Sequence, residues 1–179
     1  MEQKRWYVMR DLKRANAKNT ACSQLEEAGM EVFTPREWRV RTRNGKRCRE
    51  YVAVLPDLLF VHAERKELDA QVECIPTLQY RYLRGGYCRP MVVADAEMER
   101  FVRAVSLSDE PRFYLPGEIT GAMCSRHIRI VGGPFGGYEG KLLSVRGSKV
   151  KRLVVELPGF LSVAVVVNPE MIELVKVDR

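Results

Sequence analysis

The sequence predicts an α+β protein in two parts: an α/β sandwich with helices packed on a largely antiparallel sheet, then a small β-barrel. Strand-like and helix-like segments alternate up to about residue 107. Residues 106–117 lose this periodicity and contain two prolines, as interdomain segments do. Beyond them, short valine-rich runs separated by Gly and Pro turns show no helical period. We therefore expect a first domain over residues 1–107, a linker over 108–117 and a second domain over 118–179.

The first domain shows the order strand, helix, strand, strand, helix, strand, helix. The first helix is expected over residues 14–28, because alanine and leucine recur every three or four residues and Gly29 supplies a left-handed stop. A third helix is expected to begin near Asp95, with apolar residues along one stripe. The strands and the remaining helix are expected at residues 6–9, 31–34, 58–61, 67–74 (the helix) and 79–83.

A basic arm from Trp38 to Leu55 contains the clearest hairpin signal of the chain. Asn44-Gly45 favours the positive φ angles that a two-residue type I′ turn requires. Before this turn, arginines alternate with other residues, so a strand places them on one face. The candidate nucleic-acid-binding residues are Arg39, Arg41, Arg43, Lys46, Arg47 and Arg49. A solvated hairpin, or one that contacts an acidic protein, is the alternative.

The charge of the chain favours an acidic partner. Its formal net charge is +7, and residues 1–50 alone hold 13 Lys and Arg against 7 Asp and Glu. The excess therefore lies in the part that contains the hairpin. Nucleic acid is the commonest partner of such a surface, and a basic face that only aids solubility is the alternative.

Other function classes find little support. The five cysteines form no C-x-x-C pair, so neither a zinc site nor another cofactor is expected. There is no G-x-S-x-G elbow, and no enzyme is expected. No apolar run approaches the roughly 20 residues that span a bilayer. The start of the chain has no apolar signal-peptide core, so a reduced, cytoplasmic protein is expected.

The glycine-rich stretch from Gly132 to Gly140 is expected to be a tight turn between strands. It lacks the Lys-Ser/Thr of a phosphate-binding loop, and no helix follows it. Its glycines would adopt the positive φ angles of tight turns. The aromatic residues Phe135 and Tyr138 would either pack in the barrel or be presented to a nucleic-acid base.

Residues 128–140, Ile-Arg-Ile-Val-Gly-Gly-Pro-Phe-Gly-Gly-Tyr-Glu-Gly, resemble the KOW motif, with Gly133, Pro134, Phe135, Gly137 and Gly140 at its motif positions. The opening Trp6-Tyr7, the stretch Leu55 to Val61 and the Leu83-Arg-Gly-Gly segment resemble the NusG N-terminal (NGN) domain. In order along the chain, these pieces resemble the NusG family of transcription elongation and antitermination factors. The phrase Glu31-Val-Phe-Thr-Pro-Arg-Glu-Trp is similar to that of specialised UpxY-like and RfaH-like paralogues, which act on polysaccharide operons.

Two features depart from the family pattern. The usual Phe-Pro-Gly-Tyr phrase reads Leu55-Pro56-Asp57-Leu58 here, and residues 117–126 make a longer approach to the KOW strand. Residues 153–167 are dense in β-branched side chains, which favours a constitutive barrel over a domain that refolds into a helical hairpin.

The resemblance implies an NGN domain that docks on the clamp helices of RNA polymerase through an apolar patch. Tyr7, Leu55 and Pro56 are the matching residues, and core packing is the alternative role for Tyr7 and Leu55. DNA or nascent RNA in the elongation complex would contact the hairpin, and the ribosome or another factor would contact the KOW domain. A KOW-type ribosomal or RNA-binding module is the alternative function.

Overall fold

The computed structural model describes residues 3–13, 17–144 and 147–175. The chain divides into two compact units, Met1–Ala96 and Glu97–Arg179. The predicted α+β class is confirmed, since three helices accompany antiparallel sheets in the described residues. The units divide within α3 (Asp95–Leu107), whereas the sequence predicts the boundary after this helix. The predicted linker contains β8 (Arg112–Tyr114), which pairs with the second sheet. The domain bounds drawn from the sequence stay a prediction.

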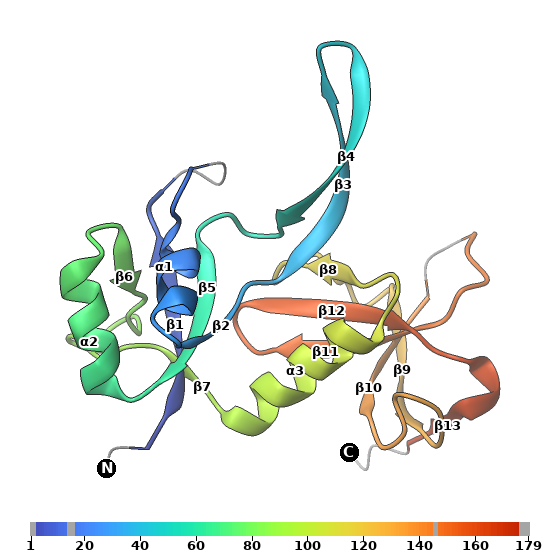
Figure 1. Cartoon of the computed structure of the whole chain (residues 1–179). Helices are drawn as coiled ribbons and strands as arrows, with labels where there is room; N and C mark the ends of the chain where they lie inside the picture. The colour runs from blue at the N-terminus through green and yellow to red at the C-terminus, as the bar shows by residue number, and fades with distance from the viewer. Residues whose placement is uncertain (1–2, 14–16, 145–146, 176–179) are drawn as a thin grey trace. The chain divides into compact units, whose positions relative to one another are not determined.

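The first unit is built on an antiparallel sheet in the order β2-β5-β1-β6, with β7 also paired to β1 (Figure 1). Its central strands are β1 (Arg5–Asp11) and β5 (Leu58–Ala63), flanked by β2 (Glu31–Phe33), β6 (Leu78–Tyr80) and β7 (Val92–Val93). The helices α1 (Ala21–Glu27) and α2 (Arg65–Cys74) contribute Leu25 and Leu68 to a core cluster with Met9 and Val61 of the sheet. These helices therefore cover the same face of the sheet.

The first helix begins later than the sequence predicts. Residues 14–16 of the predicted helix lie outside the described residues, and Asn19 has a positive φ of 58°. Thr20 is the N-cap, and its hydroxyl accepts the Ser23 N–H at 3.3 Å. A capping side chain at this position fixes the start of a helix, which the alanine spacing alone does not reveal. The predicted stop at Gly29 is confirmed by its φ of +78°.

Asp11 anchors the start of α1 to the sheet. This buried carboxylate accepts the Ala21 N–H at 2.7 Å and the Lys13 N–H at 3.0 Å. We expect Asp11→Ala to lower the free energy of unfolding by about 2 kcal/mol, because two backbone donors lose a charged acceptor. Asp11→Asn keeps an acceptor oxygen and should recover part of the loss. Chemical denaturation measures both, and an unchanged midpoint for Asp11→Ala would contradict the anchoring role.

A two-stranded hairpin extends from the first unit (Figure 1). It consists of β3 (Arg36–Arg43) and β4 (Lys46–Ala53), paired in register from Arg36↔Ala53 to Arg43↔Lys46. The turn residues Asn44 and Gly45 have φ angles of +49° and +75°. The predicted two-residue hairpin is therefore confirmed.

The second unit contains a six-stranded antiparallel sheet in the order β13-β9-β10-β11-β12-β8. Residues Arg152 to Val155 of β11 are all buried, so both faces of this strand are covered, as a strongly curled sheet requires. One cluster of its core consists of Leu143, Val154 and Ala164. The other strands are β9 (Cys124–Ile130), β10 (Glu139–Leu143), β12 (Leu161–Val166) and β13 (Ile172–Leu174), with β11 at Arg152–Leu157 and a 3-10 turn η1 at Pro169–Met171.

Candidate functional site

Two faces of the hairpin follow from the register of its strands. Directly paired residues of an antiparallel ladder share a face, and successive residues alternate. The arginine face carries Glu37, Arg39, Arg41, Arg43, Lys46, Cys48, Glu50 and Val52. The aromatic face carries Arg36, Trp38, Val40, Thr42, Arg47, Arg49, Tyr51 and Ala53. The six basic residues predicted from the sequence are all exposed, and they divide between the two faces.

Carboxylates offset part of the charge on the arginine face. Arg39 pairs with Glu37 at 2.5 Å, and Arg43 pairs with Glu50 at 3.3 Å. Arg41 lies 3.9 Å from the same Glu50 carboxylate. These pairs are exposed and each contributes little to stability. They hold the guanidinium groups in place, and the arginine face keeps a net positive charge.

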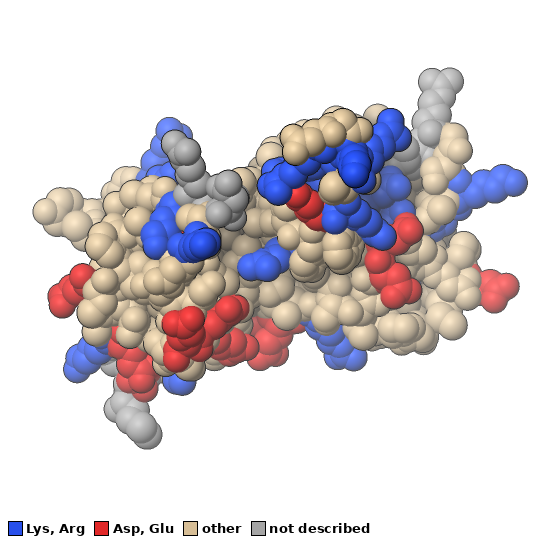
Figure 2. Space-filling model, turned by 45° about the horizontal axis from the view of Figure 1, so that its top comes forward, with Lys and Arg blue, Asp and Glu red and all other residues tan. Residues whose placement is uncertain are grey.

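The arginine face and part of the aromatic face, including Tyr51, border a basic pocket of about 550 Å³. Besides the predicted arginines, Lys13 and Arg36 line it, whereas Asp11 and Glu50 are its acidic residues. Figure 2 shows Lys and Arg side chains gathered over the hairpin, with a few Asp and Glu side chains among them. An excess of cations around a concave surface favours a polyanion such as a nucleic-acid backbone.

Cys22 also lines the basic pocket, but it gives no sign of nucleophilic chemistry. Burial and the nearby Glu26 carboxylate raise the pKa of its thiol. A raised pKa keeps the thiol protonated at neutral pH, and the thiolate is the reactive form. Among the described residues no group of three or more His, Cys, Asp or Glu side chains is placed to hold a metal ion. The Cys22 thiol therefore lines the pocket as a neutral group.

The turn at Leu55-Pro56-Asp57 holds a second cluster of charge. The Asp57 carboxylate accepts hydrogen bonds from Arg10 at 3.2 Å and from Arg81 at 3.1 Å. Two guanidinium groups thus share one carboxylate and leave a net positive charge beside the turn. The Arg81 Nε is buried without a hydrogen-bond partner among the described residues.

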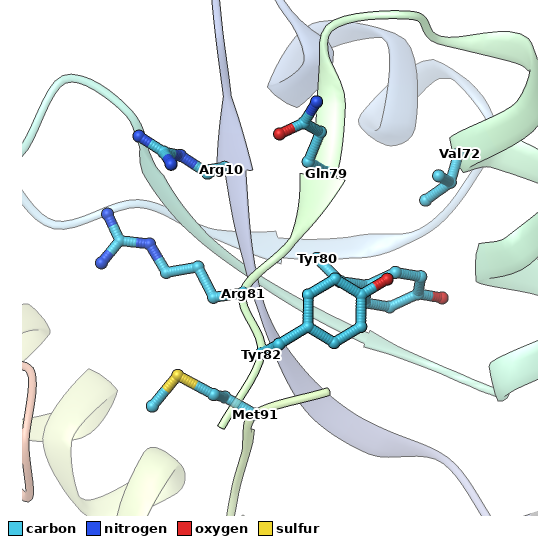
Figure 3. Close-up of a pocket in the computed structure, with 7 residues that line it drawn as sticks. All are labelled: Arg10, Val72, Gln79, Tyr80, Arg81, Tyr82 and Met91. Carbon is cyan, nitrogen blue, oxygen red and sulfur yellow. The ribbon is translucent and has the colours of Figure 1, made fainter. Parts of the chain in front are cut away.

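Arg10 and Arg81 line an open pocket of about 840 Å³ on the first sheet. Figure 3 shows the guanidinium groups of Arg10 and Arg81 on one side of the segment from Gln79 to Tyr82, with the rings of Tyr80 and Tyr82 on its other side. The Tyr80 hydroxyl donates to Asp69 at 2.8 Å, and burial together with this bond raises the pKa of Tyr80. The ring of Tyr80 is therefore held in place as a neutral group.

The three residues predicted for a polymerase patch lie in different environments. Tyr7 is 6% exposed, belongs to the core cluster and packs edge-on against Tyr80, with ring centroids 5.8 Å apart. Pro56 is exposed and Leu55 is half-buried, both in the turn between β4 and β5. Tyr7 thus has little surface for a partner, whereas Leu55 and Pro56 are accessible.

Of the KOW-like residues, Gly133, Pro134, Phe135 and Gly137 lie in the connection between β9 and β10, and Gly140 lies in β10. Gly133 and Gly137 have φ angles of +71° and +86°, which only glycine adopts readily. Phe135 and Tyr138 are buried and meet edge to face, with centroids 5.8 Å apart. The two rings therefore pack within the turn and are not presented to solvent. The Tyr138 hydroxyl also donates to the Arg100 carbonyl of α3 at 3.1 Å.

The family described as "Transcription termination factor nusG" matches residues 4–102 of this sequence. The chain belongs to the NusG family. This is a family of non-enzymatic transcription factors, and NusG family factors interact with RNA polymerase. The matched segment contains the hairpin, the Leu55-Pro56 turn and both pockets of the first unit.

The fold of this NusG family chain also resembles a solved structure. The structure is described as "Domain interaction in Thermotoga maritima NusG". The match covers 97% of this chain and 98% of the Thermotoga maritima chain, with a TM-score of 0.50 and 18% sequence identity. At this identity the similarity concerns the fold alone. No curated protein matches the sequence. Among the described residues, no helix is long and apolar enough to span a membrane.

Sequence reasoning missed several residues of the NusG family candidate site. Trp38 and Tyr51 are exposed aromatic neighbours on the hairpin, with ring centroids 5.0 Å apart. Their pairing follows from the Asn44-Gly45 register, so the sequence held the signal. Arg10 and Arg81 meet at Asp57 only through the tertiary fold, and no sequence spacing indicates that cluster.

Proposed function

We propose that this chain is a transcription elongation and antitermination factor that binds RNA polymerase and promotes processive elongation. The observation that carries the proposal is the NusG family match over residues 4–102. Such a factor needs no catalytic residue, because it acts by binding the elongating state of the polymerase better than the paused state. A difference of about 1.4 kcal/mol in binding free energy shifts that balance tenfold. We place this activity in the cytoplasm.

The polymerase contact in this proposal is the exposed turn of Leu55 and Pro56, with the clamp helices as the partner. The half-buried leucine and the exposed proline supply apolar surface. Arg10 and Arg81 supply a positive charge next to it. Tyr7 would support this contact indirectly, through its packing against Tyr80.

The target in this proposal is a specific, polysaccharide-type operon, as for UpxY-like and RfaH-like paralogues. The support is the segment from Glu31 to Trp38, which runs through β2 into the start of the hairpin. The basic pocket and the hairpin would then meet DNA or nascent RNA in the elongation complex. The KOW-like domain would supply a second, tethered contact to the ribosome or another factor, which raises its effective concentration.

We expect the double substitution Leu55→Ser and Pro56→Ser to weaken binding to RNA polymerase about tenfold or more, because it removes apolar surface from the contact. Binding of the full chain to purified polymerase, measured by biolayer interferometry, tests this. The chain offers a matched control in Leu115 and Pro116, an exposed Leu-Pro turn of the second unit. The same substitutions there should leave polymerase binding unchanged. Equal affinities for the wild type and the Leu55/Pro56 variant, both folded by circular dichroism, would contradict the assigned contact.

A further inference from the structure

The aromatic face of the hairpin exposes two large rings side by side. Trp38 and Tyr51 form a directly opposed pair, with centroids 5.0 Å apart and ring planes inclined by 42°. Their exposed fractions are 57% and 50%, and Val40 beside them is 67% exposed. A cross-strand aromatic pair contributes to hairpin stability, and here about half of the surface of each of the two residues also stays in water.

The cations of this face differ from those of the arginine face. Within residues 3–13, 17–144 and 147–175, the ion pairs of the hairpin join Arg39, Arg41 and Arg43 to Glu37 and Glu50. Arg36, Arg47 and Arg49 of the aromatic face have no carboxylate partner among these residues. Arg49 instead lies over the Trp38 ring, 4.9 Å from its centroid. The aromatic face thus combines two accessible rings with three uncompensated guanidinium groups.

This combination fits single-stranded nucleic acid. A base of a single strand has a free face that can stack on an aromatic side chain, whereas the bases of a duplex are stacked on one another. The guanidinium groups beside the rings match the phosphates that flank each base. An acidic protein surface would match the arginines and bury the two rings as well, so the experiment compares nucleic-acid probes that differ in strand state.

We propose that the aromatic face binds single-stranded nucleic acid, with bases stacked on Trp38 and Tyr51 and phosphates held by Arg36, Arg47 and Arg49. This inference rests on the proposed nucleic-acid contact of the hairpin and specifies its ligand. The two faces meet at the basic pocket, which Arg36 and Tyr51 also line. The arginine face supplies attraction that is independent of strand state, while base stacking on the aromatic face distinguishes single strands from duplexes.

Tryptophan fluorescence of the full chain tests the stacking directly. The chain has two tryptophans, of which Trp6 is 5% exposed and Trp38 is 57% exposed. The probes are 12-nucleotide oligo-dT, 12-nucleotide oligo-U and a 12-base-pair DNA duplex. We expect a single-stranded probe to quench the emission of Trp38, and the duplex to quench it much less. Comparing oligo-dT with oligo-U tells DNA from RNA as the preferred strand.

Affinity of the same probes, measured by anisotropy of a fluorescein label, separates stacking from charge. The double variant Trp38→Ala and Tyr51→Ala should bind single strands about 100-fold more weakly, because two stacked bases are lost. Its duplex affinity and the slope of affinity against salt should not change, since no charge is removed. The conservative variant Trp38→Phe and Tyr51→Phe keeps both rings and should bind single strands nearly as well as the wild type.

Single-strand affinity retained by the alanine variant, or equal quenching by single strand and duplex, would overturn the inference. In either case the electrostatic contact of the hairpin and the polymerase contact would stand. If none of the probes binds the wild type, both this inference and the nucleic-acid part of the proposed function fail. The polymerase-binding measurement with the Leu55/Pro56 variant remains independent of all these outcomes.

Discussion

Gly140→Ala is expected to destabilise the second unit by about 3 kcal/mol. Gly140 lies in β10 and is paired with Ile128 of β9. A Cβ built on it falls well under 3.0 Å from the Val154 carbonyl oxygen, and 3.0 Å from the Leu153 Cδ1. The leucine side chain can move, but the carbonyl belongs to the backbone of β11. The strands must therefore separate, and the ladder between β10 and β11 is expected to weaken.

Hydrogen exchange of peptides from β10 and β11, with calorimetry of the full chain, measures this loss. Gly121→Ala is the matched control, because its Cβ would meet no atom within 4 Å and its φ is not positive. That variant should unfold within about 0.5 kcal/mol of the wild type. Equal protection of β10 in the Gly140→Ala variant and the wild type would mean that the two strands do not approach as closely as described.

The second large effect is expected from the arginine face. Substituting glutamine for Arg39, Arg41 and Arg43 leaves Glu37 and Glu50 without their partners and makes this face net negative. At 0.1 M salt we expect nucleic-acid affinity to fall roughly 10- to 100-fold. The slope of log affinity against log salt should become about two units shallower, since each lost phosphate contact reduces the magnitude of this slope by about 0.7–0.9.

A triple variant of equal charge provides the control for this experiment. Lys66, Arg84 and Arg89 are exposed cations of the first unit outside the hairpin. Their replacement by glutamine lowers the net charge by the same amount but leaves the hairpin intact. Titrations of both variants with the 12-base-pair duplex decide the matter: if the two lose affinity equally, total charge and not the hairpin governs binding.

Local signals predicted the hairpin well because they act over short distances. Asn44 and Gly45 specify the turn through their own backbone angles, and the turn fixes the register of both strands. The stop at Gly29 is of the same kind. The predicted start of the first helix was wrong, because the side chains of Thr20 and the distant Asp11 determine where the helix begins. The alanine spacing extends to residues before Thr20 and does not reveal this start.

The candidate site was predicted only in part, because much of it is assembled by tertiary contacts. The six basic residues of the hairpin are exposed as expected. Only the structure shows that Glu37 and Glu50 form ion pairs with the arginines of one face. Nothing local indicates that Lys13 joins the basic pocket. The resemblance left Tyr7 either in a polymerase patch or in the core, and the ring packs against Tyr80 in the core cluster.

The central claim is that this NusG family chain acts on a transcribing polymerase. A single-round transcription assay with purified RNA polymerase of the source organism and a template bearing a known pause tests it most directly. Saturating wild-type chain should shorten the pause and raise the yield of full-length transcript, whereas the Leu55→Ser and Pro56→Ser variant should do so only at higher concentration. Unchanged pausing at saturating protein, together with no polymerase binding, would contradict it.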